Sequence, residues 1–346
     1  MEEKVKEEIF EASLSPEIQS KMAELSATVK GESKAHVSFY DPLDETFEGK
    51  KKRLKTQVFK NERMWNLLHG AYDIHQHSGP SVHTERLFDE LELATQGCYM
   101  GLGGIVFKDM HTSSARSVKI VQKVVDRWAQ EHARERKIEL FGGVCLNYAV
   151  GGLNSDAVIA AYRIGGKYVW LPSMDANHHR RVVGNGIGQG IDLLDESDQL
   201  VPKAKEVLSL IAETDMVLGV GHQSTKERLA VVREAVKMGI QRIEVNHVNY
   251  PLTWLTPEQC KMFADLGAYL GIYAIDVGRF YSLDDLMAIY KAVGPERIVF
   301  GSDCGHIANP HPIDSLRMLI LSFLQSGVPD DHIKMMCQTN SYNLLH

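Results

Sequence analysis

Two histidines, His75 and His77, stand one residue apart in the run AYDIHQH (71–77). Because side chains alternate between the two faces of an extended strand, both imidazoles point the same way and can bind one ion. Three more candidate ligands each follow an apolar run further along the chain: His222, His247 and Asp303. Imidazole nitrogens with a carboxylate suit zinc, and also manganese, iron, cobalt or nickel. The pattern therefore predicts a divalent metal site, and zinc is the ion we expect.

These residues can meet only if the fold brings the ends of distant strands together. Eight short apolar runs alternate with helical patterns, and they cover residues 71–77, 104–110, 140–147, 168–173, 217–222, 243–248, 268–274 and 298–303. Two of the helical patterns open with a capping box, formed by Ser224 with Glu227 and by Thr256 with Gln259. Near-continuous apolar strands, each followed by a helix, indicate a parallel sheet buried on both faces. The count of eight favours an α/β fold of the closed (β/α)8 TIM-barrel type over an open sheet.

In such a barrel the active site lies at the carboxyl ends of the strands. His75 and His77 end the first strand, and the other candidates end later strands: Lys108 the second, His222 the fifth, His247 the sixth and Asp303 the eighth. A single histidine at a strand end is usually a hydrogen-bonded structural residue. Four histidines and an aspartate at the ends of four strands instead indicate one shared metal site.

The chain divides into two parts. Residues 1–70 are rich in charge and read as a helical and irregular N-terminal extension, with a helix expected over 62–68. Residues 71–346 form the predicted barrel domain. Apolar positions in the extension suit packing on the barrel or on a second subunit, so we expect a homo-oligomer; these positions are Ile9, Phe10, Ile18, Met22 and Leu25.

The composition argues against several other classes of protein. The 346 residues include 38 Lys and Arg against 45 Asp and Glu, and this net charge of −7 does not suit a nucleic-acid partner. No apolar run approaches the roughly 18 residues of a membrane span, and the first residues lack the hydrophobic stretch typical of a signal peptide. The five cysteines are scattered, which indicates reduced thiols. We expect a cytoplasmic protein with a small-molecule substrate and no membrane partner.

At these residues the sequence resembles the amidohydrolase superfamily, whose members have a (β/α)8 barrel with H-x-H on strand 1, His on strands 5 and 6, and Asp on strand 8. The resemblance spans the barrel, and stretches such as HSGPSVH and PSMDANHH look like an uncharacterised branch. It implies a metal-dependent hydrolase that cleaves an amide, lactam, lactone or related C–N or C–O bond. It also implies that Asp303 is the general base and that His247 helps to polarise the attacked carbonyl. The implied metal ligands are His75, His77, His222, His247 and Asp303.

One departure from the superfamily concerns the ligand that bridges two ions. Binuclear members carry a carboxylated Lys or a Glu at the end of strand 4, where this chain reads VWLPSMD. Lys108 instead ends strand 2, after the apolar run GGIVF, and a buried lysine needs a partner or a lowered pKa. A carboxylated Lys108 would be a catalytic-site ligand that bridges two ions. Lys108 could instead form a salt bridge to Asp109 or Asp73, or act as a cation that binds the substrate. Without a bridging Lys108, the site would hold one ion.

Other residues are placed to contact the substrate. His83 and His111 follow strands 1 and 2, and solvated loop histidines are the competing interpretation. One of three residues after strand 4 could replace the missing strand-4 ligand: Asn177, His178 or His179. Three arginines after strands 4 and 7 could bind a carboxylate, although surface charge is the commoner role; they are Arg180, Arg181 and Arg279.

Three functions fit this pattern. The first is the hydrolase, in which a metal-activated water attacks the substrate. The second is a non-oxidative decarboxylase on the same barrel, in which one ion binds the acid and Asp303 protonates carbon. The third is a scaffold without catalysis, which would have no use for metal ligands at strand ends.

Overall fold

The computed structural model of the chain describes residues 62–132, 137–184, 189–277 and 282–346. Its strands are all parallel and pair in chain order, β1 to β3 in one group and β4 to β9 in another. The strands are β1 (Tyr72–Gln76), β2 (Gly104–Phe107), β3 (Glu139–Phe141), β4 (Gly143–Cys145), β5 (Tyr168–Trp170), β6 (Val217–Val220), β7 (Ile243–Val245), β8 (Tyr269–Tyr273) and β9 (Ile298–Gly301).

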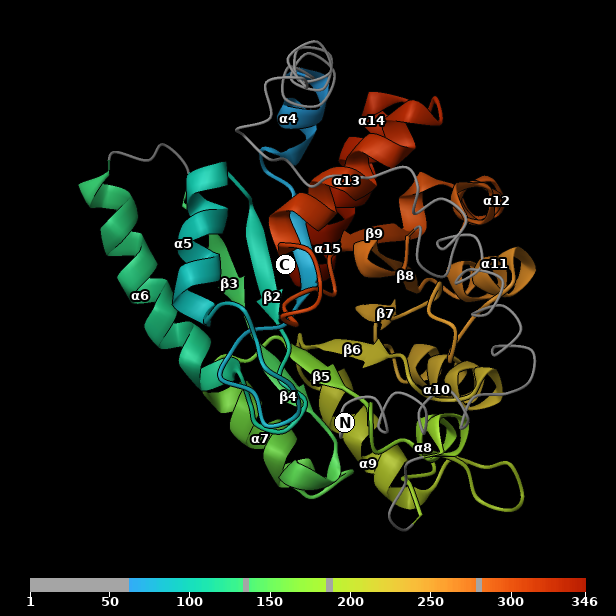
Figure 1. Cartoon of the computed structure of the whole chain (residues 1–346). Helices are drawn as coiled ribbons and strands as arrows, with labels where there is room; N and C mark the ends of the chain where they lie inside the picture. Colours follow the sequence, from blue (N-terminus) through green and yellow to red (C-terminus); the bar gives the residue numbers. More distant parts are fainter. Residues whose placement is uncertain (1–61, 133–136, 185–188, 278–281) are drawn as a thin grey trace, which may run out of the picture.

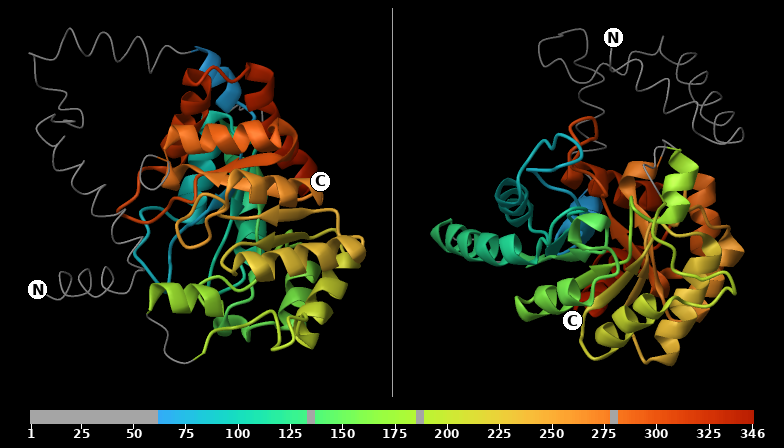
Figure 2. Two further views of the ribbon diagram at one scale, coloured as in Figure 1. Left: turned by 90° about the vertical axis from the view of Figure 1, so that its right-hand side faces the viewer. Right: turned by 90° about the horizontal axis from the view of Figure 1, so that it is seen from below.

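Backbone hydrogen bonds join the last strand to the first. The N–H of Asp303 donates to the carbonyl of His75 at 2.8 Å, and the N–H of His77 donates to that of Cys304 at 2.9 Å. The strands therefore form a ring, with the helices around its outside (Figures 1 and 2). All eight predicted strands are present in the described part of the chain, and the predicted parallel α/β barrel is confirmed.

The third predicted strand is broken at Gly142, where β3 ends and β4 begins. Ser114 lies against this point, and its Oγ accepts from the N–H of Gly143 at 3.0 Å and donates to the carbonyl of Phe107 at 2.7 Å. A Cβ on Gly142 would come within 2.8 Å of the Ser114 backbone. The close approach of Ser114 therefore requires glycine here and interrupts the strand.

The helices connect successive strands and cover their outer face. They are α4 (Glu62–Leu68), α5 (Glu90–Met100), α6 (Ala115–Glu131), α7 (Ser155–Arg163), α8 (Asn177–Val183), α9 (Pro202–Ala212), α10 (Thr225–Lys237), α11 (Pro257–Asp265), α12 (Leu283–Val293), α13 (Pro312–Gln325), α14 (Asp330–Lys334) and α15 (Asn340–Leu345). Both predicted capping boxes are confirmed, at the first residues of α10 and α11. No helix among the described residues is long and apolar enough to cross a membrane.

The barrel interior is filled by aromatic and aliphatic side chains. Tyr168, Trp170 and Tyr273 are at most 1% exposed and belong to one interior cluster. Leu344 and Leu345 of α15 join the same cluster, so the C-terminal helix closes one end of the barrel. Polar side chains, among them His75, His77 and Asp303, lie at the opposite end of the barrel, at the carboxyl ends of the strands.

Of the predicted N-terminal extension (residues 1–70), only the helix near its C-terminal end is confirmed. The helix expected over 62–68 is α4, which buries Met64, Leu67 and Leu68. The apolar positions expected to pack on the barrel or on another subunit lie outside the described residues.

Candidate metal centre

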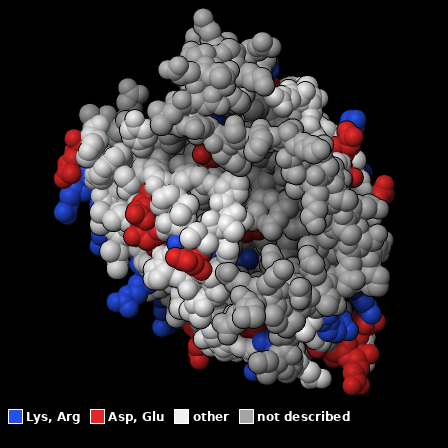
Figure 3. Space-filling view, viewed as in Figure 1, with Lys and Arg blue, Asp and Glu red and all other residues white. Residues whose placement is uncertain are grey.

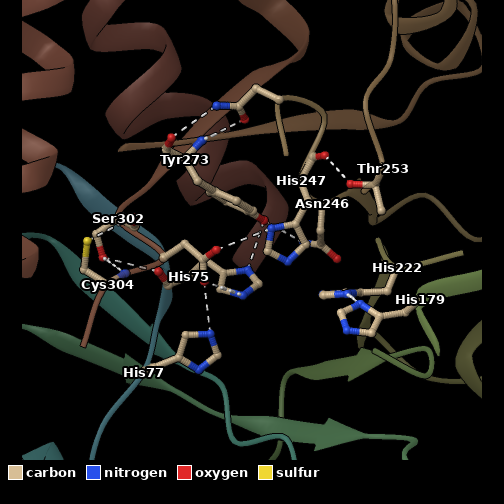
Figure 4. Close-up of polar contacts among 12 residues, drawn as sticks. His75, His77, His179, His222, Asn246, His247, Thr253, Tyr273, Ser302 and Cys304 are labelled. Atoms are coloured by element: carbon tan, nitrogen blue, oxygen red, sulfur yellow. Dashed lines mark hydrogen bonds and ion pairs between the residues drawn. The ribbon is translucent and has the colours of Figure 1, made fainter. Parts of the chain in front are cut away.

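Three predicted ligands lie together at the carboxyl ends of β1 and β9. His75, His77 and Asp303 each offer a ligand atom, and these atoms lie within 4.8 Å of one another. Nε2 of His77 is 3.0 Å from Oδ1 of Asp303, and Nε2 of His75 is 3.6 Å from the same oxygen. The alternation of side chains along β1 thus brings both imidazoles to the Asp303 carboxylate, as the sequence predicts. Figure 4 shows the rings of His75 and His77.

The contacts of His77 suit a ligand. Its Nδ1 lies 2.9 Å from the carbonyl oxygen of Lys108, which can only accept a hydrogen bond. Its Nε2 faces the Asp303 carboxylate, which is also an acceptor when ionised. A neutral imidazole has one N–H and cannot donate to both acceptors. Either an imidazolium, or a neutral ring with a metal cation between Nε2 and the carboxylate, satisfies both. The site therefore fits a metal ion.

His75 and His247 have buried nitrogens without a partner. Among the described residues, Nε2 of His75 and both nitrogens of His247 have no hydrogen-bond partner, although His75 is fully buried and His247 is 4% exposed. Nδ1 of His247 lies 3.4 Å from Oδ2 of Asp303. Buried polar groups in proteins are normally bonded, so these nitrogens are candidate ligands.

The environment keeps the imidazoles of His75 and His247 neutral. Burial lowers the pKa of His75 well below its ordinary value, and the charge of Lys108 adds to this effect. Burial likewise lowers the pKa of His247 to about 3, although Asp303 opposes it. A neutral imidazole has a lone pair for a metal ion. The pKa values therefore favour metal binding near neutral pH.

The backbone at two of these residues is strained. His247 has φ 56° and Asp303 has φ 52°, and both values lie in the left-handed region that glycine prefers. Residues held in this region cluster at functional sites. The two residues also lie against each other, with Nδ1 of His247 3.4 Å from Oδ2 of Asp303.

His222, the predicted ligand after β6, lies apart from the three-residue group. Its Nδ1 contacts Nδ1 of His179 at 2.8 Å, and its ring centroid is 4.7 Å from that of His247. The sequence offers Asn177, His178 and His179 for the strand-4 position, and of these His179 lies beside His222.

Lys108 is buried at the end of β2, as predicted. Its Nζ lies 5.8 Å from the centre of the Trp170 ring, and the side chain is 4% exposed. Among the described residues it has no ion pair with Asp73 or Asp109. Both carboxylates accept from backbone N–H groups instead, Asp73 from Ser302 and Asp109 from the next turn. The salt-bridge alternative is therefore wrong.

The other predicted contacts are scattered around the rim. The rings of His83 and His111 lie near each other, with centroids 6.3 Å apart. His178 contacts the carbonyl of Leu252 at 2.9 Å, and Arg180 pairs with Asp175 at 2.7 Å. Arg181 is exposed, and Arg279 lies outside the described residues. A space-filling view shows acidic and basic side chains of the described residues spread over this face of the molecule (Figure 3).

A buried polar network beneath the site was not predicted. The Tyr273 hydroxyl donates to Glu244 at 2.7 Å, and Tyr168 donates to the same carboxylate at 3.0 Å. Burial raises the pKa of Glu244 to about 7, although both phenols lower it. Glu244 and Asn246 interrupt the apolar run IEVNHV, and this interruption is the signal that could have revealed the network.

Comparison with known proteins supports the fold. A sequence model of a family described as a family of unknown function (DUF6282) matches residues 70–271. An amidohydrolase from Pseudomonas aeruginosa is similar with a TM-score of 0.51 at 11% identity, over 82% of this chain and 97% of that chain. A beta-aspartyl dipeptidase from Fervidobacterium islandicum AW-1 has a TM-score of 0.51 at 14% identity, over 80% and 74%. No curated protein matches the chain. The resemblance to the amidohydrolase superfamily is confirmed at the level of fold.

Proposed function

The chain belongs to DUF6282, a family of unknown function, and we propose that it is a metal-dependent hydrolase. One observation carries the proposal: His75, His77 and Asp303 converge within 4.8 Å at the end of the barrel where active sites form. The nitrogens of His75 and His247 that lack a hydrogen-bond partner within the described ranges support it, because they provide further ligand atoms at the same place. Zinc is the ion that we propose.

The residues around the ion have separate tasks. A divalent ion would lower the pKa of water towards 7 and polarise a carbonyl. Asp303 would accept the proton of the attacking water and pass it to the leaving group, because its carboxylate faces the centre of the cluster. Burial raises the pKa of Asp303, but His247 and the hydrogen bond with His77 outweigh this effect and lower it overall. The group is therefore ionised and ready to accept a proton.

The substrate that we propose contains an amide, lactam, lactone or related C–N or C–O bond. Its attacked carbonyl would lie over His75, His77 and Asp303, with His247 beside it. His83 and His111 stand on the loops after β1 and β2, where they would contact the parts of the substrate that do not react.

A decarboxylase on the same site is the second candidate. Lys108 favours it, because a buried lysine without an ion pair among the described residues could hold a carboxylate in a site with one ion. In that reaction Asp303 would deliver a proton to carbon. The two candidates differ in their product, which is a hydrolysed bond in one and carbon dioxide in the other.

The test is a screen of amides, lactams, lactones and aromatic acids with chain purified without chelator or tag. We expect hydrolysis that stops when a chelator removes the metal and returns when zinc is added. The His77→Ala variant serves as the blank. Release of carbon dioxide without hydrolysis would establish the second candidate, and a chain that binds no metal would contradict both.

A further inference from the structure

Arg86 lies on the loop that follows β1, at the same end of the barrel as the candidate metal centre. This loop pairs with the loop after β9 in a short antiparallel ribbon. The N–H of Leu87 donates to the carbonyl of Gly305, and the N–H of Ile307 donates to that of Glu85, both at 3.2 Å. The two loops leave the carboxyl ends of the strands that lead to the three-residue group. The ribbon therefore holds Arg86 where a substrate would enter.

The ribbon turns the side chain of Arg86 inward. Arg86 pairs with His306 across the ribbon, so these two side chains share one face, and those of Glu85 and Leu87 lie on the other. Glu85 is exposed and Leu87 is 46% exposed, whereas Nε of Arg86 is buried. A Cβ on Gly79 would lie 3.1 Å from Cβ of Arg86, so the base of the arginine side chain packs against that glycine. The guanidinium thus lies on the shielded face.

The guanidinium of Arg86 has no partner within the described ranges. Its Nε has no hydrogen-bond acceptor, and no ion pair joins it to a described carboxylate. Two carboxylates act on its charge, those of Asp303 and Asp109, but both are bound elsewhere. Asp303 contacts His77 at 3.0 Å, and Asp109 accepts from the N–H of His111 at 2.7 Å. Because a cation shielded from water is normally paired, the free guanidinium points to an anion from outside the chain.

The charge around Arg86 suits a carboxylate. Burial lowers the pKa of His83, and the nearby His111 and Arg86 lower it further, so this imidazole is neutral near pH 7. The surroundings thus offer one guanidinium, with Asp303 and Asp109 close enough to act on it. This balance matches an anion with one charge better than a phosphate with two. A guanidinium also binds both oxygens of a carboxylate through two parallel hydrogen bonds.

We propose that Arg86 binds a carboxylate group of the substrate that does not itself react. This inference rests on the proposed function, and it narrows the substrate to amides, lactams or lactones that carry a carboxylate beside the bond to be cleaved. The arginines expected in this role follow strands 4 and 7, yet Arg180 pairs with Asp175 and Arg181 is exposed. The competing role of Arg86 is structural, in which it holds the ribbon and does not contact the substrate.

The test compares two series of hydroxamates on the full chain loaded with zinc. All of them bind zinc through the same head group, and their chains of three to five carbons end in either a carboxylate or a methyl group. We expect the best carboxylate to bind about 10–100-fold more tightly than its methyl counterpart, because hydrogen bonds to charged groups contribute about that much. Calorimetry measures the dissociation constants. Arg86→Gln should remove the preference, whereas Arg163→Gln, at an exposed position in the last turn of α7, should keep it.

A structural role would give a different result. Loss of the ribbon in Arg86→Gln would weaken both series alike and leave the ratio of their dissociation constants as in the wild type. Arg86→Lys keeps the charge without the parallel hydrogen bonds, so we expect it to keep part of the preference. Circular dichroism checks that each variant is folded. If Arg86→Gln is not, Arg86→Lys decides, and a full wild-type preference in it would contradict the proposal.

The remaining outcomes separate this inference from the proposed function. Equal binding of the two series by the zinc-loaded wild type would overturn the role of Arg86 and leave the hydrolase proposal standing. A chain that holds no zinc and binds neither series would instead contradict the hydrolase. Succinate and succinamide then test Arg86 alone: a preference for succinate that Arg86→Gln removes would support its role, and equal binding would overturn it.

Discussion

The phenol oxygen of Tyr273 lies 3.0 Å from Nδ1 of His75, inside the barrel. Tyr273 gives its only hydroxyl hydrogen to Glu244 and accepts a hydrogen bond from Asn246 at 2.7 Å. Nδ1 of His75 must therefore be the donor in its contact with Tyr273. The lone pair of His75 is then on Nε2, which faces Asp303. Partners of this kind fix the orientation and tautomer of a metal-binding histidine.

Replacing Tyr273 with phenylalanine should weaken metal binding. The change removes the acceptor for Nδ1 of His75, and the loss of such a partner costs about 10–100-fold in affinity. Competition with a chromophoric chelator measures it. Tyr168→Phe is the control, because that phenol also bonds Glu244 but does not contact His75. Equal affinities in the two variants would contradict the role of Tyr273.

His75→Ala and His77→Ala should each remove the metal and leave a folded barrel. Each change deletes one imidazole from the three-residue group, whereas the barrel core is made of apolar side chains away from the strand ends. Elemental analysis and circular dichroism measure the two properties, and His83→Ala on the neighbouring loop is the control. A variant with full metal occupancy would exclude its residue from the ligands.

Asp303→Asn should retain part of its metal and lose turnover. An amide oxygen can still contact the ion, but an amide cannot accept the proton of water. Loss of a general base lowers the rate by about 10²–10⁴-fold. Rate and metal content should be measured on the same preparation, with any substrate found in the screen. A rate close to that of the wild type would rule out Asp303 as the base.

If Lys108 is the bridging ligand and not a cation for the substrate, it should become carboxylated when metal binds. Its side chain is buried and lacks an ion pair within the described ranges. Labelled bicarbonate added during reconstitution should give a carbamate signal in carbon-13 NMR, and short carboxylates should partly restore metal to Lys108→Ala. Lys108→Arg provides the contrast, because arginine keeps the charge but forms no carbamate. Wild-type metal content in Lys108→Arg would show that the residue acts as a cation.

The metal-free protein should lose stability in acid through His247. Burial lowers the pKa of His247 to about 3, whereas an imidazole in an unfolded chain titrates near 6.5. Between these values the unfolded state binds more protons, so the free energy of unfolding falls as the pH drops. The slope should be shallower in His247→Gln, by up to about 1.4 kcal/mol per pH unit. Denaturant unfolding at several pH values measures it, and parallel curves would contradict the prediction.

The sequence predicts the parts of the site that depend on strand periodicity. His75 and His77 share a face because a strand alternates, and the strand-end position of Asp303 follows from the barrel. The capping boxes at Ser224 and Thr256 were also predictable, because each depends on residues only three positions apart.

The remaining features depend on contacts that leave little local signal. The direction of His179 follows from where α8 begins, and the residue before that helix, Ala176, has no capping side chain to mark the start. The break at Gly142 depends on Ser114, which comes from a different connection of the barrel. Tyr273 reads as one more apolar position of its strand until Glu244 is found beside it.

The left-handed backbone at His247 and Asp303 lowers the stability of the fold at the two positions where the candidate site needs a side chain. A residue with a side chain costs about 1–2 kcal/mol in this conformation, and glycine adopts it freely. A barrel with glycine at either position should therefore resist heat better, yet it would have no side chain there to aim at the axis. Selection for thermal stability alone would favour replacement of these two residues by glycine. A screen for thermostable variants of this protein should therefore also measure metal content.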